Sequence, residues 1–158
     1  ADEMLLISGL ASNAEEAAKK RMTALDSGAA AEKFAQMVAG LGGPSDLLDK
    51  ADIYLPRAKY IRPVYANHSG YLASMDTRAI GMAVVDLGGG RTRASDTLDY
   101  SVGLNQIASL GQKLDQQTPL CFVHASHEDD FNRAQQSILA AIQLSESKVK
   151  MAPVLHQF

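Results

Sequence analysis

Apolar side chains in the first third of the chain recur at helical intervals. They return every three or four positions over residues 12–27 and again over residues 29–40, which predicts two amphipathic helices. Ser12 and Glu15 have the spacing of a capping box at the start of the first helix, and Gly28 is placed to end it. Both helices also have a polar side, so we expect their apolar sides to pack against a larger body.

The chain opens inside an apolar segment. Residues 4–7 are all apolar, as in the last turns of a helix that Gly9 ends. Because no capping residue precedes this helix and the first residue is Ala1, we expect a piece of a longer protein. Loss of an initiator methionine from a natural terminus is the alternative. Pro44 suits the first turn of a short helix, which we expect to run to Asp49.

Residues with high β-propensity dominate the next part of the chain. Residues 59–66 are rich in tyrosine, valine and isoleucine, residues 67–70 have the composition of a turn, and residues 71–75 are predicted to form a returning strand. Pro63, inside the first strand, indicates an edge position or a bulge. Helical periodicity then returns over residues 76–87.

The last part combines short strands with one long amphipathic helix. We expect strands over residues 97–104 and 119–125, the second continuously apolar as in a buried strand. Residues 126–144 have the periodicity of a single helix, and residues 153–158 could add an edge strand. The whole pattern predicts an α+β fold, with leading helices followed by a module that contains a small, largely antiparallel sheet.

Composition and charge narrow the classes of function. Hydrophobic residues make up 46% and charged residues 21% of the 158, which is enough apolar surface for a core. The net charge of −3 offers no basic field to nucleic acid or to an anionic membrane. The single cysteine, Cys121, fits a reducing compartment, and the acidic start lacks the basic region of a signal peptide. We therefore expect a cytoplasmic protein.

Three consecutive glycines, Gly88 to Gly90, followed by Arg91 and Arg93, are the most suggestive feature for chemistry. Backbone amides of a glycine loop can hold phosphate, and arginines add positive charge. These glycines, however, follow a predicted helix, whereas a phosphate site needs them before one, at the positive end of the helix dipole. The sequence favours a flexible helix exit over a phosphate site.

No other group of residues predicts catalysis or metal binding. Asp96 and Asp99 lie three apart near a predicted strand, so they would point to opposite faces. The acidic run 128–130 suits the first turn of a helix, and Cys121 lies in an apolar run as an inert core thiol. The four histidines lack zinc-ligand spacing. They are His68, His124, His127 and His156.

Residues 54–125 contain an ordered series of short motifs. They are Ser-Met-Asp-Thr-Arg-Ala at 74–79, Gly-Met-Ala-Val-Val at 81–85, Gly-Gly-Gly-Arg at 88–91 and Ala-Ser-Asp-Thr-Leu-Asp-Tyr-Ser-Val-Gly at 94–103. In this order they closely resemble the C-terminal region of bacterial thymidine phosphorylases, in the pyrimidine-nucleoside phosphorylase family. The helices up to Pro44 resemble the preceding segment of the same enzymes, so the likeness covers nearly the whole chain.

The resemblance implies an enzyme that cleaves thymidine and related deoxynucleosides with inorganic phosphate, releasing the pyrimidine and 2-deoxyribose 1-phosphate. It implies a homodimer whose subunit has a helical domain and a large α/β domain. Residues 1–54 would be the helical tail of the large domain, and residues 55–158 its C-terminal α/β-hammerhead module. We expect no cofactor, and the net charge of −3 argues against nucleic acid and membrane partners.

The family's catalytic motifs are not in this chain. The Lys-His-Ser phosphate segment and the Ser-Gly-Arg signature that leads to Gly-Thr-x-Asp are missing, as are the residues that hold the pyrimidine. We therefore assign no catalytic, substrate-binding or metal-binding residue, and we expect the isolated chain to be inactive and structural. One contribution to the site is expected from a mobile loop at the cleft between domains, formed by Gly88, Gly89, Gly90 and Arg91 and reaching Ser95.

Two other interpretations of the function remain open. Residues 110–114 and the apolar strand after them resemble half of a biotinyl/lipoyl-type carrier domain, which needs a lysine at a hairpin tip. The corresponding turn would lie near residues 74–76, which include no lysine. The second alternative is a free-standing regulatory or partner-binding α+β module.

Overall fold

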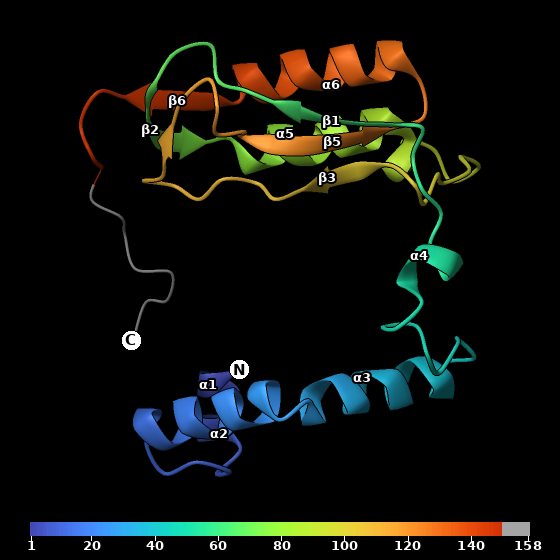
Figure 1. Cartoon of the computed structure of the whole chain (residues 1–158), viewed down its shortest axis with the longest axis vertical. Helices are drawn as coiled ribbons and strands as arrows, with labels where there is room; N and C mark the ends of the chain where they lie inside the picture. Colours follow the sequence, from blue (N-terminus) through green and yellow to red (C-terminus); the bar gives the residue numbers. More distant parts are fainter. Residues whose placement is uncertain (150–158) are drawn as a thin grey trace. The chain divides into compact units, whose positions relative to one another are not determined.

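The computed structural model describes residues 1–149, and contacts within the chain divide it into two compact units. The first unit is Ala1–Tyr54 and the second begins at Leu55 (Figure 1). The prediction for residues 153–158 lies outside the described residues.

The first unit is helical, as the apolar periodicity predicts. Its helices are α1 (Asp2–Ile7), α2 (Ala14–Asp26), α3 (Ala29–Gly40) and the single turn α4 (Ala51–Tyr54). Gly28 separates α2 from α3 in a left-handed conformation, with φ of 80°. A side chain at that position would be strained, so glycine suits the junction.

Two expectations for this unit are wrong in detail. The residue that caps α2 is Asn13, whose Oδ1 accepts the amide of Glu16 at 2.9 Å, so the predicted pair of Ser12 and Glu15 is one residue too early. The Glu16 carboxylate completes the cap by accepting the Ser12 amide at 2.8 Å. The short helix expected from Pro44 is a series of turns, and the helical turn starts later, at Ala51.

The second unit contains two three-stranded antiparallel sheets within the described residues, which confirms the α+β class. One sheet has the order β1 (Tyr60–Val64), β5 (Cys121–Ala125), β3 (Gly103–Asn105). The other has the order β4 (Lys113–Leu114), β2 (Gly70–Met75), β6 (Ile142–Ser145). Pro63 lies on β1, an edge strand, as expected.

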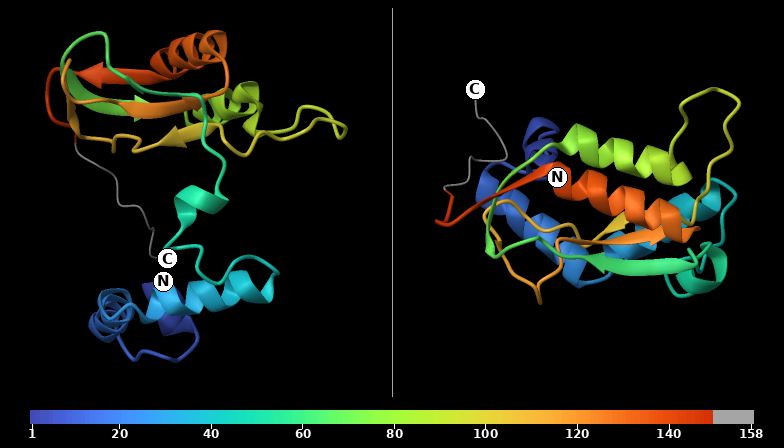
Figure 2. Two further views of the ribbon diagram at one scale, coloured as in Figure 1. Left: turned by 45° about the vertical axis from the view of Figure 1, so that its right-hand side comes forward. Right: turned by 90° about the horizontal axis from the view of Figure 1, so that it is seen from above.

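Two helices lie side by side over the first of these sheets (Figure 2). They are α5 (Thr77–Val84), which continues into the π-helical turn η1 (Val85–Gly89), and α6 (Glu128–Ala140). Asp76 caps α5 by accepting the Ala79 amide at 3.0 Å. The core lies between these helices and the strands, and its most buried side chains are Leu72, Leu114, Leu120, Ile138, Val64, Val123 and Cys121.

Three predictions for the second unit are corrected. The strands β1 and β2 do not form a hairpin, because β2 pairs with β4 and β6 in the other sheet. The strand expected over residues 97–104 is only Gly103–Asn105. The helix expected over residues 126–144 ends at Ala140, and the rest is the strand β6, which pairs antiparallel with β2. The one sheet expected from the sequence is therefore two.

Candidate functional site

The three glycines lie where the helical stretch of α5 and η1 ends and a loop begins. Gly88 lies in η1 with φ of 97°, and Gly89 ends that turn. A Cβ built on Gly89 would lie 2.9 Å from Val84 Cγ1, and one on Gly90 would lie 2.6 Å from Val85 Cγ2. The glycines therefore allow a tight turn against the preceding helix, which is the role of a helix exit.

The segment that follows, residues 90–98, projects away from the second unit (Figure 2), and we call it the arm. Its tip is closed by Asp96, whose Oδ2 accepts the amides of Thr92 at 3.0 Å and Arg93 at 2.8 Å. The Thr92 hydroxyl donates to the same oxygen at 2.8 Å. These hydrogen bonds, that of the Thr92 hydroxyl first, lower the pKa of Asp96 and stabilise its ionised form.

Arg91 and Arg93 both lie on the exposed part of the arm. The Nε of Arg91 donates to the backbone oxygen of Asp96 at 3.1 Å, although the residue is exposed. Two arginines on a projecting turn can meet an anion or a carboxylate surface. Whether the arm moves, as the sequence leads us to expect, stays a prediction.

Asp99 lies where the arm returns to the body of the unit. Its Oδ1 accepts the amide of Ser101 at 2.9 Å and the hydroxyl of the same residue at 2.6 Å. Its Oδ2 accepts the hydroxyl of Ser126, just before α6, at 2.5 Å. Hydrogen bonds from Ser101 and then Ser126, with the charge of His127, lower the pKa of Asp99. Asp96 and Asp99 thus accept hydrogen bonds from different groups, and they form no acid–base pair.

The remaining titratable residues singled out in the sequence have structural surroundings. Burial raises the pKa of the Cys121 thiol to about 11, so the thiolate nucleophile is absent at neutral pH. Glu128, in the first turn of α6, accepts from Arg62 at 2.7 Å. His124 lies on β5, His127 directly precedes α6, and no group of metal-ligating side chains gathers in residues 1–149. His156 lies outside this range.

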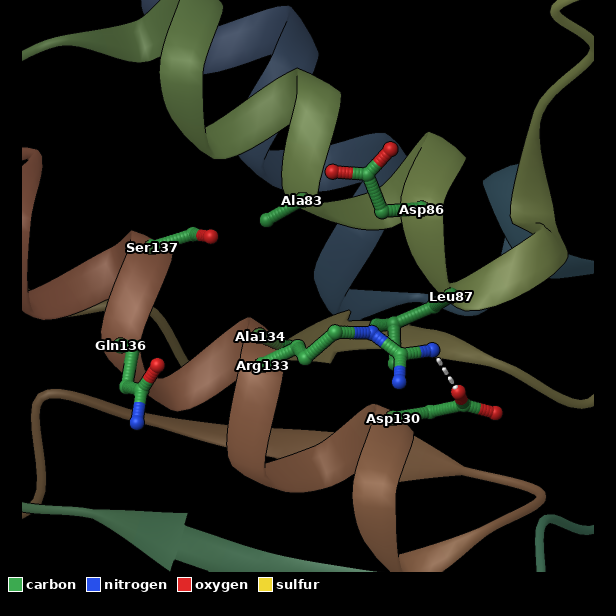
Figure 3. Close-up of a pocket in the computed structure, with 8 residues that line it drawn as sticks. All are labelled: Ala83, Asp86, Leu87, Asp130, Arg133, Ala134, Gln136 and Ser137. Carbon is green, nitrogen blue, oxygen red and sulfur yellow. Dashed lines mark hydrogen bonds and ion pairs between the residues drawn. The ribbon is translucent and has the colours of Figure 1, made fainter.

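A pocket of about 520 Å³ lies between α6 and the helical stretch of α5 and η1 (Figure 3). Its apolar floor is formed by Ala83, Leu87 and Ala134, and Arg133 extends across it and pairs with Asp130. Sequence reasoning missed this pocket. The small residues Ala83 on α5 and Ala134 on α6 are the sequence signal that could have indicated a pocket between these helices. The polar residues at its rim are Asp86, Gln136 and Ser137.

The carrier-domain reading depends on a hairpin tip near residues 74–76. The structure places these residues at the junction of β2 and α5, where Asp76 is the helix cap. A side chain there ends a strand and starts a helix, so it cannot present a cofactor on an exposed hairpin. No helix in the described part of the chain is long and apolar enough to span a membrane.

Comparison with known families finds a match within the second unit. Residues 71–145 match the family described as the pyrimidine nucleoside phosphorylase C-terminal domain. This stretch belongs to that family. The matched pyrimidine nucleoside phosphorylase domain begins in β2 and ends with β6, so it includes α5, the arm, Asp99 and α6. The match confirms the resemblance to the pyrimidine-nucleoside phosphorylase family over these residues, and it places the glycine turn inside the matched domain.

Proposed function

We propose that the chain is the C-terminal part of a thymidine phosphorylase. The match of residues 71–145 to the pyrimidine nucleoside phosphorylase C-terminal domain carries this proposal. The whole enzyme would cleave thymidine with inorganic phosphate, giving thymine and 2-deoxyribose 1-phosphate. It would be a cytoplasmic homodimer, and this chain would supply the end of its large domain. The motifs at residues 74–103 resemble those of thymidine phosphorylases in their order, whereas the residues that would select the base belong to the rest of the enzyme.

In this proposal the isolated chain supports the reaction without performing it. Phosphorolysis requires a bound phosphate aligned with the anomeric carbon and groups that stabilise charge on the departing base. Among the described residues, the buried thiol of Cys121 is protonated at neutral pH and Ser101 donates its hydroxyl to Asp99. The carboxylate that accepts from Ser101 has a lowered pKa, so it is a weak base for activating a nucleophile.

The surface of the first unit supports its place in a larger body. Only Ala11 and Ala17 are buried there, so the unit has hardly any core of its own. A mainly apolar groove of about 600 Å³ lies between its first helices, next to Met4, Leu10 and Leu25. Exposed apolar surface on this scale marks an interface. We assign that interface to the preceding part of the same enzyme. Further exposed apolar side chains of the unit are Ile7, Met37, Leu41 and Ile53.

The arm is the part of this chain that we place nearest the chemistry. It projects from the phosphorylase module and carries Arg91 and Arg93. In the whole enzyme it would border the cleft between domains and exclude water when the cleft closes. Arginine at such a border can approach the phosphate or an acidic residue on the facing domain.

The inactivity of the isolated chain is tested by release of thymine from thymidine. The purified 158-residue chain is incubated with thymidine, with and without inorganic phosphate, and thymine is followed by chromatography. We expect no release in either case. Release that depends on phosphate would contradict the proposal that other residues perform the chemistry, and it would direct attention to Arg91, Arg93 and His68.

A further inference from the structure

Asp99 is the point at which three separate segments of the phosphorylase module meet. Its backbone amide donates to the carbonyl oxygen of Gly88 at 3.0 Å, which joins the two ends of the arm. Its carboxylate holds Ser101, on the way to β3, and Ser126, on the turn between β5 and α6. A single residue thus contacts the end of η1, the segment after the arm and the start of α6.

Both carboxylate oxygens of Asp99 are in use. Oδ1 accepts two hydrogen bonds from Ser101, and Oδ2 accepts one from Ser126 at a distance of 27 residues along the chain. Hydrogen bonds to an ionised acceptor are stronger than bonds between neutral groups. A charged group therefore fixes the base of the arm to the start of α6, beside the core residue Leu87 and the half-buried Val102.

The base of the arm and its tip are held independently. Asp96 binds only groups inside the arm, those of Thr92 and Arg93, and it makes no contact with Asp99's partners. Loss of the Asp96 hydrogen bonds would open the tip without freeing the base. Loss of the Asp99 hydrogen bonds would free the base and leave the tip closed.

We propose that Asp99 is a positioning residue that clamps both ends of the arm to the start of α6, while Asp96 independently closes the tip of the arm. The clamp is a property of this chain alone. Its purpose, to set the direction of Arg91 and Arg93 at the cleft, rests on the proposed function.

Backbone amide hydrogen exchange of the 158-residue chain, read residue by residue by NMR, tests the clamp. In Asp99→Ala we expect exchange at the amide of residue 101, which loses its carboxylate acceptor, to accelerate about tenfold or more. The amide of residue 99 keeps its backbone bond to Gly88, and we expect it to accelerate because the base of the arm, no longer held by the carboxylate, opens more often. The amides of Thr92 and Arg93 keep their wild-type rates, because Asp96 still holds them. The amide of Val123, in the central strand β5, also keeps its rate if the module stays folded.

Two matched variants complete the design. Asp96→Ala removes a carboxylate from the same arm, and we expect it to accelerate exchange at Thr92 and Arg93 only. Asp115→Ala removes a carboxylate that holds the amides of Gln117 and Thr118 in another loop, at 2.8 and 2.7 Å, and it should leave the arm unchanged. If Asp99→Ala does not fold, Ser126→Ala tests the clamp, because it removes only the hydrogen bond to Oδ2. We then expect faster exchange at residue 99, while the amide of Ser101 keeps its bond to Oδ1.

The proposed clamp is contradicted if the amides of residues 99 and 101 exchange within about twofold of their wild-type rates in Asp99→Ala. It is also contradicted if the amides of Thr92 and Arg93 at the tip accelerate together with the base, or if exchange at Val123 accelerates equally, because the effect is then not local.

A separate measurement on the whole phosphorylase tests the purpose of the clamp, which is to direct Arg91 and Arg93 at the cleft. We expect Asp99→Asn to lower kcat/KM for thymidine at a temperature well below the Tm of the variant, where it is fully folded. If exchange accelerates only at the base of the arm in Asp99→Ala but kcat/KM is unchanged in Asp99→Asn, the clamp is supported and the arm has no part in the proposed mechanism.

Discussion

At the scale of single residues, carboxylates that accept loop hydrogen bonds make the module sensitive to acid. The pKa of Asp99 is lowered by Ser101, Ser126 and His127, and hydrogen bonds also lower the pKa of Asp96 and Asp115. A carboxyl group whose pKa is lower in the folded state contributes stability above its unfolded pKa of about 4. That stability is lost as the pH falls through the folded value.

We therefore predict that the free energy of unfolding of the phosphorylase module falls between about pH 7 and pH 3, and falls less in Asp99→Asn. Urea unfolding at the two pH values, followed by circular dichroism, measures both differences. Glu146→Gln is a suitable control, because Glu146 is an exposed residue that follows β6 and lies outside any helix. An equal loss of stability in wild type and Asp99→Asn would contradict the role assigned to this carboxylate.

The thiol of Cys121 provides a second prediction. Cys121 is 1% exposed and its pKa is raised to about 11 by burial, so both access and ionisation oppose reaction. We expect a thiol reagent to modify the native chain slowly at neutral pH and to react at once when urea unfolds the module. Absorbance of the released chromophore gives both rates. Fast reaction of the native chain would show that β5 is less buried than the structure indicates.

At the scale of elements, α6 contributes to stability through a narrow buried stripe. Ile138 is 1% exposed and belongs to the core, whereas Gln136 is exposed two residues earlier on the same helix. We predict that Ile138→Ala destabilises the module by about 2–5 kcal/mol and that Gln136→Ala changes stability by less than about 0.5 kcal/mol. Urea unfolding measures both, and similar effects of the two substitutions would contradict the assigned orientation of α6.

The same elements show what the sequence could predict. Periodicity identified α2, α3, α5 and the buried strand β5, because each has an apolar pattern that local contacts enforce. It merged α6 with β6, because Ile142 and Leu144 continue the apolar pattern past the end of the helix. It also predicted a hairpin of β1 and β2, since local turn signals do not reveal that β2 pairs with strands distant in the sequence.

The candidate site was less accessible to sequence reasoning than the fold. The glycines were correctly interpreted as a helix exit, because their order after a helix is visible in the sequence. The contact between Asp99 and Ser126 joins residues 27 positions apart, so no local spacing indicates it. The expected strand around Asp99 is a loop, and this is why its carboxylate can reach two serines from different segments.

At the scale of the whole molecule, the two units differ in how much core they possess. The buried cluster consists only of residues from the second unit, whereas the first unit buries two alanines. We predict that residues 55–158 expressed alone unfold cooperatively, and that residues 1–54 alone show no cooperative transition. Thermal unfolding by circular dichroism distinguishes the two. A cooperative transition of residues 1–54 would contradict the view that this unit needs a larger body.

The central claim is that this chain is part of a thymidine phosphorylase, and the most direct measurement is activity of the whole protein that contains it. That protein, purified, is supplied with thymidine and inorganic phosphate, and the products are identified by mass spectrometry. The account predicts thymine and 2-deoxyribose 1-phosphate in equal amounts, with no release of thymine when phosphate is omitted. Absence of phosphate-dependent cleavage of thymidine would contradict it.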